Sequence, residues 1–234
     1  MVPFVAHKRV WRSLTFVVPL ALVVVLSGCS SKTSTSGTST TRASTTTTST
    51  TSAAGGVTPI TLAGGVVSTG SVTCTNVTGT ITFSPPLSNT GTSPETTRLS
   101  LTATGCTTAG SSGTQVTSGT ATATIQSPTN GCISLLTSKP VAVAVTWSPS
   151  SIHASVASFS GYAIVSDAAQ HIGFGLPNAK GSVSVAGSFA GTDNGAKSTA
   201  STYSNITTVQ LLTACGTTAG VPTLAIARGT VTFS

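Results

Sequence analysis

The sequence predicts an all-β domain from residue 55 to the C-terminus, built as an antiparallel sandwich or a barrel-like sheet. Short runs of alternating apolar and Thr or Ser residues are separated by Gly, Pro, Asn and Ser, the pattern of strands and turns. The chain has 24 Gly and 11 Pro, and only 6% of its residues are charged. A helical bundle, which is rich in Leu, Glu, Gln and Lys, is therefore excluded.

The strands can be placed in order along the chain. Runs at 72–83 and 97–106 are symmetric about residue 90 and predict a hairpin that turns near Thr90 and Gly91. Residues 141–145 are apolar on both faces, as in a central strand. Further strands are expected at 115–125, 155–165, 181–189 and 224–233. One short helix is expected at 205–214.

The N-terminus has the layout of a signal peptide. Lys8, Arg9 and Arg12 precede an apolar run over residues 13–26. This run has 14 residues and contains Pro19, whereas a membrane-spanning helix needs about 20 apolar residues. The run is therefore predicted to direct export, with residues 1–28 removed.

The end of this run indicates lipidation. Leu26, Ser27, Gly28 and Cys29 resemble the lipobox of bacterial lipoproteins, and actinobacterial ones in particular, which also carry Ser/Thr-rich tethers. The resemblance implies that the Cys29 sulfur takes up a diacylglyceryl group, that cleavage precedes Cys29, and that the new amino terminus is then acylated, for example with palmitate. The expected partner of this end is the cell membrane, at its extracytoplasmic face.

A polar segment separates the predicted anchor from the domain. Of the 23 residues at 30–52, 19 are Ser or Thr and none is large and apolar. Such a segment cannot bury a core, so residues 29–54 are expected to form a disordered tether. The domain itself is similar to β-rich domains that actinobacteria secrete.

Four cysteines remain in the domain, and an even number in an exported chain suggests two disulfides. They are Cys74, Cys106, Cys132 and Cys215. Three pairings are possible. The predicted hairpin sets Cys74 opposite Cys106, which would leave Cys132 for Cys215. A metal site is disfavoured, because no two cysteines are close in sequence and only His153 and His171 could assist.

The charges exclude one class of partner and offer little chemistry. The chain has a formal net charge of +7, but half of its ten basic residues precede the domain, and the others are scattered. Nucleic acid is therefore not an expected partner. Glu95 follows Pro94 in a predicted loop, and Asp193 with Asn194 and Gly195 predicts a turn.

Three functional hypotheses follow. The first is a noncatalytic envelope lipoprotein that binds a ligand or protein partner, with Trp147 and Tyr162 as partly exposed aromatic platforms. The second is a carrier of lipid or another apolar ligand, which would require an apolar cavity. The third is a hydrolase that uses Asp167, His171 and an unidentified serine. No catalytic motif is present and no cofactor is expected.

Overall fold

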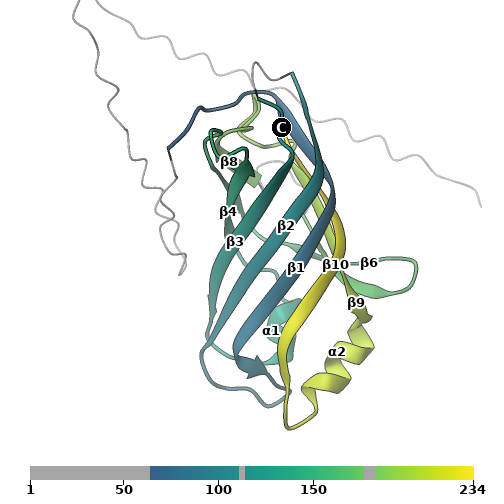
Figure 1. The fold of residues 1–234 in the computed structure, drawn as a ribbon. Coiled ribbons are helices and arrows are strands. Elements are labelled where there is room, and N and C mark those ends of the chain that lie inside the picture. Colours follow the sequence, from purple (N-terminus) through teal and green to yellow (C-terminus); the bar gives the residue numbers. More distant parts are fainter. Residues whose placement is uncertain (1–63, 111–113, 177–182) are drawn as a thin grey trace, which may run out of the picture. The chain divides into compact units, whose positions relative to one another are not determined.

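A computed structural model describes residues 64–110, 114–176 and 183–234. This part of the chain is mostly antiparallel β-structure with two short helices (Figure 1). The strands are β1 (Ser71–Leu87), β2 (Glu95–Ala109), β3 (Ser118–Ser127), β4 (Val141–Ser148), β5 (Ser155–Phe159), β6 (Ala163–Ser166), β7 (His171–Gly175), β8 (Val183–Gly187), β9 (Thr199–Thr207) and β10 (Val221–Phe233). The helices are α1 (Cys132–Leu136) and α2 (Thr208–Cys215).

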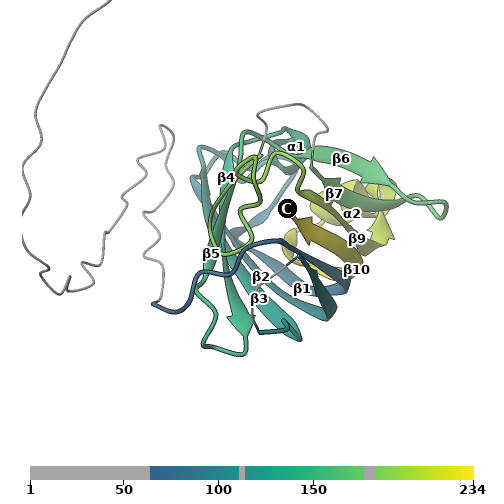
Figure 2. The same cartoon turned by 90° about the horizontal axis from the view of Figure 1, so that it is seen from above.

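The strands form one ten-stranded sheet in the order β6-β7-β9-β10-β1-β2-β3-β4-β5-β8. The last strand, β10, pairs with the first, β1, so the two ends of the domain meet at the centre of the sheet. Figure 2 shows the sheet curling around an interior as a half-barrel. The all-β prediction is confirmed, and its barrel-like alternative describes the sheet better than a sandwich.

The predicted hairpin is present with the predicted register. Strands β1 and β2 pair so that Cys74 faces Cys106, Val77 faces Ala103 and Phe83 faces Thr97. The turn between the strands contains Thr90 and Gly91. Alternating positions on both strands are buried, which explains why the sequence alternates between apolar and Thr or Ser residues.

The buried residues form two clusters. The larger contains Trp147, Phe189 and Phe233, and the smaller contains Leu211 of α2 and Leu135 of α1. Leu99 and Leu101 of β2 pack against both clusters. The two clusters are therefore neighbours along one curled sheet, and the helices lie at the end where the smaller cluster is found (Figure 1).

Several elements differ from the sequence prediction. The strand expected at 155–165 is two strands, β5 and β6, separated around Gly161, and the strands β7 and β9 and the helix α1 were not predicted. The helix expected at 205–214 is α2, which begins at Thr208 because a capping box fixes its start. The Thr207 hydroxyl accepts from the Gln210 N–H at 3.2 Å, and the Gln210 side chain accepts from the Thr207 N–H at 2.8 Å.

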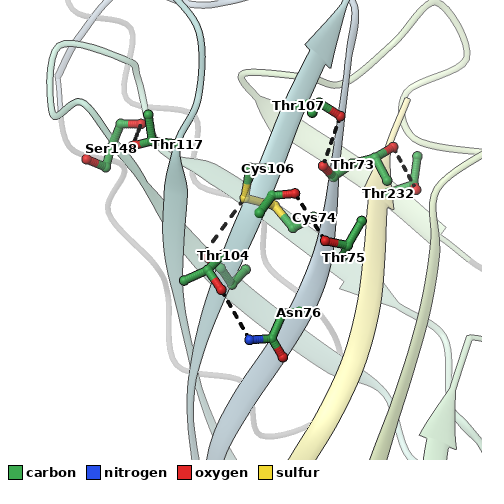
Figure 3. The surroundings of a disulfide bond; sticks show 12 residues. Thr73, Cys74, Thr75, Asn76, Thr104, Cys106, Thr107, Thr117, Ser148 and Thr232 are labelled. Carbon is green, nitrogen blue, oxygen red and sulfur yellow. Dashed lines mark hydrogen bonds between the residues drawn. A yellow bond between two sulfur atoms is a disulfide. The ribbon is translucent and has the colours of Figure 1, made fainter.

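Two disulfides cross-link the domain. Cys74 is joined to Cys106 across the β1–β2 hairpin (Figure 3), and Cys132 of α1 is joined to Cys215 at the end of α2. This is the pairing that the hairpin favours. Disulfides form and persist in oxidising compartments, so the pairs indicate an extracytoplasmic environment. Within the described ranges, neither helix is long and apolar enough to cross a membrane.

Candidate functional site

The curled sheet encloses an apolar cavity of about 190 Å³. Its walls come from both halves of the sheet and include Leu99 and Leu101 of β2, Val143 of β4, Phe174 of β7 and Val231 of β10. These side chains follow from the alternation of the strands, which turns every second residue inward. The interior is thus a hollow with a mainly apolar lining, which is the kind of cavity that the carrier hypothesis requires.

Strand register gives the cavity two chemically different ends. At one end Glu95 of β2 lies opposite Ser127 of β3, and at the other Ala103 lies opposite Gly119, which in turn lies opposite Trp147. Glu95 and Ala103 are eight residues apart on one strand, a distance of about 27 Å at the usual rise per residue. The cavity is therefore elongated along the strands.

The end near Trp147 is apolar and closely packed. The indole ring contacts Phe189 and Phe233 edge-on, with ring centroids 5.4 and 5.5 Å away. Its N–H donates to the Ser155 hydroxyl at 2.8 Å, so the one polar atom of the ring is satisfied. A Cβ at Gly119 would lie 2.9 Å from the indole, so glycine is needed there for the ring to fit.

The opposite end carries polar and charged side chains. Glu95 is only 2% exposed, and one of its carboxylate oxygens accepts from the Thr97 hydroxyl at 2.8 Å. The Lys139 ammonium, just before β4, donates to the Ser127 hydroxyl at 2.7 Å. All four of these side chains line the cavity. A carboxylate and an ammonium thus lie at the same end of an otherwise apolar hollow.

Burial and the charge of Glu95 affect the pKa values of two side chains at this end, Lys139 and Tyr162. Burial lowers the pKa of Lys139 below its usual value, and the negative charge of Glu95 opposes that change. Burial, with a smaller contribution from Glu95, raises the pKa of Tyr162 to about 12. In both cases burial is the larger cause and the charge of Glu95 the smaller one.

Tyr162 also lines the cavity and is held by hydrogen bonds to the segment that contains α1. Its hydroxyl lies 2.8 Å from the Leu135 carbonyl oxygen and 2.9 Å from that of Thr137, and it donates to this pair. Its backbone N–H donates to the Ser138 hydroxyl at 2.9 Å. These contacts join the β5–β6 connection to α1 and the segment after it. The Cys132–Cys215 disulfide then fixes α1 to α2.

The two aromatic residues singled out by the sequence, Trp147 and Tyr162, both line this cavity. Trp147 is 4% exposed, so the expectation of a partly exposed ring is wrong for it; β4 turns the ring inward against Phe189 and Phe233. Tyr162 is half-buried and stacks edge-on against Phe174 at 5.7 Å. Cys29 lies outside the described residues.

Glu95 is the residue that sequence reasoning missed. It was expected in a loop after Pro94, but it is the first residue of β2 and is buried. The overlooked signal was the alternation itself. Glu95 continues the inward series of Thr97, Leu99 and Leu101, so a carboxylate at that position must face the interior.

The structure brings Asp167 and His171 together, at the connection between β6 and β7. A carboxylate oxygen of Asp167 lies 2.9 Å from His171 Nδ1, and the same oxygen contacts the Arg228 guanidinium. The other oxygen accepts from the N–H groups of Ala169 and His171 and so holds the turn. Among the hydrogen bonds of the described residues, none joins the His171 ring to a serine hydroxyl, which the hydrolase hypothesis needs.

No group of three or more metal-ligating side chains occurs within residues 64–110, 114–176 and 183–234. His153, the other histidine considered, has its Nδ1 2.8 Å from the Ala154 carbonyl oxygen. No protein family, curated protein or solved structure matches this chain. The cavity and its two ends therefore carry the functional argument.

Proposed function

We propose that this chain is an exported, lipid-anchored protein of the cell envelope whose β domain binds an apolar ligand inside the curled sheet. The observation that carries the proposal is the apolar cavity of about 190 Å³. It favours the carrier hypothesis and gives the broader hypothesis of a noncatalytic binding domain a class of ligand.

The volume and lining support binding of an apolar chain. An engineered cavity of about 150 Å³ with aliphatic and aromatic walls stays dry and binds benzene. The hollow here is larger, and its middle section is lined by Leu, Ile, Val and Ala side chains. Protein interiors are normally filled to the density of organic crystals, so such a hollow leaves dispersion contacts unmade. A bound alkyl chain would supply those contacts.

The membrane anchor is proposed from the sequence alone. Lipid on Cys29 would hold the protein at the membrane, and a flexible segment over residues 30–52 would reach about 25–30 Å from it. The two disulfides support the export that such an anchor requires. A domain at this distance could exchange an apolar ligand with the membrane surface.

A Cys29→Ser variant tests the anchor. We expect wild-type protein to fractionate with membranes and to carry the mass of its acyl groups, and the variant to lack that mass. Immunoblots of the membrane and soluble fractions measure the fractionation, and mass spectrometry of the protein from the fraction that holds it measures the acyl mass. Wild-type protein without added acyl mass, or with its signal segment intact, would contradict the anchor.

Native mass spectrometry of the protein extracted from its own membrane tests ligand binding. We expect a retained small molecule in wild-type protein and its loss from an Ala121→Leu variant, because Ala121 lines the cavity and a larger side chain would fill it. Ala142→Leu is the matched control: it adds the same atoms on β4, at a position that alternates with the inward Val141 and Val143 and does not line the cavity. Retention in Ala121→Leu equal to that in Ala142→Leu would place the ligand elsewhere.

A further inference from the structure

We propose that the cavity selects alkyl chains that end in an uncharged hydroxyl group, as in long-chain alcohols and monoacylglycerols, over chains that end in a carboxylate or an ammonium. The proposal rests on the proposed function. It follows from the residues at the polar end of the cavity, where Glu95 and Lys139 bring opposite charges to one apolar space.

The charges of the protein side chains balance at this end of the cavity. Glu95 and Lys139 both line the cavity, and Ser127 connects them, since it faces Glu95 across the β2–β3 pairing and accepts from Lys139. One negative and one positive charge offset each other. A ligand carboxylate would be attracted by Lys139 but repelled by Glu95, and a ligand ammonium the reverse, so either ion would leave this end of the cavity with a net charge. Uncompensated charge is strongly disfavoured in apolar surroundings.

Glu95 and Lys139 also have capacity for further hydrogen bonds. A carboxylate can accept about four hydrogen bonds, and among the described residues Glu95 has one side-chain donor, Thr97. An ammonium can donate three, and Lys139 donates one to Ser127. A hydroxyl both donates and accepts, so one such group can serve the free capacity of Glu95 and Lys139 together. An alkane would serve neither.

The difference between the two ends also sets the orientation of a bound ligand. The charged groups of the lining, Glu95 and Lys139, lie at one end, while the lining of β2 and β4 from Leu99 to Trp147 is apolar. The Thr202 hydroxyl, which also lines the cavity, already donates to the Phe174 carbonyl oxygen at 3.2 Å. A ligand with one polar end therefore has one favourable orientation, with its hydroxyl at Glu95 and its chain directed toward Trp147. The opposing influence of Glu95 on Lys139 described above is consistent with charges that interact across this space.

A competition experiment tests the selection. The protein extracted from its own membrane is mixed with equal amounts of 1-decanol, decanoic acid and decylamine, and native mass spectrometry measures the bound ratios. Each variant is compared with wild type, so that differences in detergent partitioning cancel. We expect decanol to predominate in wild type. In Glu95→Gln the ratio of decanoate to decanol should rise about tenfold, and in Lys139→Gln the ratio of decylamine to decanol should rise similarly.

Lys197→Gln and Asp193→Asn are the matched controls, because these residues form an exposed ion pair at 3.2 Å that does not line the cavity. Neither control should change the ratios. Binding of all three compounds without these opposite shifts would overturn the selection but leave the cavity as a binding site. Binding of none of them, with no retained native ligand, would contradict the proposed function as well.

Discussion

The two ends of the cavity are built from the same strands but have opposite character. At the Trp147 end, aromatic rings pack edge-on and the polar atom of the indole is satisfied within the protein. At the Glu95 end, charged and hydroxyl side chains face the interior and retain capacity for hydrogen bonds. In the proposed function, the first end contributes stability and the second contributes ligand recognition. Substitutions at the two ends should therefore affect different measurements.

The largest loss of stability is expected at the aromatic end. Trp147→Ala removes a ring that is 4% exposed and contacts Phe189 and Phe233, so unfolding free energy should fall by about 3–5 kcal/mol. Urea denaturation followed by circular dichroism measures this. Trp147→Phe keeps most of the packing and should cost less. Equal stability of Trp147→Ala and wild type would refute a structural role for this end.

The two disulfides, which lie near opposite ends of the cavity, allow a second test. Removing Cys132–Cys215, which links residues 83 apart, should cost about 1 kcal/mol more than removing Cys74–Cys106, which links residues 32 apart, because the longer loop gains more entropy in the unfolded chain. Double Cys→Ser variants of each pair, compared in urea, give the difference. The Cys132/Cys215 variant should also retain less ligand than the Cys74/Cys106 variant. The reason is that the Cys132–Cys215 disulfide fixes α1, whose Leu135 carbonyl oxygen accepts from the Tyr162 hydroxyl. A larger loss of retention in the Cys74/Cys106 variant would argue against that role.

The smallest effect is expected for Tyr162→Phe, which removes a hydroxyl that donates to carbonyl oxygens of α1 and the residue after it. The free energy of unfolding should fall by about 1 kcal/mol at neutral pH.

The same variant has a signature in its pH dependence. Since the pKa of Tyr162 is raised to about 12 in the folded protein, the unfolded chain releases this proton first, at about pH 10. The contribution of Tyr162 to stability is thus fully present below pH 10 and decreases as the pH rises toward 12. In Tyr203→Phe, which keeps Tyr162 as the single tyrosine of the chain, phenolate absorbance should rise near pH 12. A rise that is complete near pH 10, the ordinary value for tyrosine, would contradict the assignment.

The sequence predicted the features that depend on local pattern. The alternation of apolar with Thr or Ser residues predicted the β class. The symmetry of the first two strands about residue 90 predicted the register that sets Cys74 opposite Cys106. Trp147 and Tyr162 were identified as candidate binding residues, and both line the cavity. The reason first offered for Trp147, partial exposure at the surface, was nevertheless wrong.

Features that depend on the closure of the sheet could not be predicted in this way. Whether strands curl around a hollow or stack as two layers depends on pairing between distant segments, such as β1 with β10. Glu95 was assigned to a loop because Pro94 precedes it, and only the position of β2 within the curled sheet shows that its carboxylate faces the interior. The strand β9 was likewise missed, since its Thr and Ser residues alternate weakly with apolar ones.

The most direct test of a cavity with one recognition end is a crystal structure of the protein with 10-bromodecan-1-ol. Bromine gives an anomalous signal that locates the end of the chain opposite the hydroxyl. We expect a bromine peak inside the sheet, among Leu99, Leu101 and Val143, with the hydroxyl oxygen within hydrogen-bonding distance of Glu95. A bromine peak beside Glu95, or only on exposed residues such as Ile133 and Val209, would contradict it.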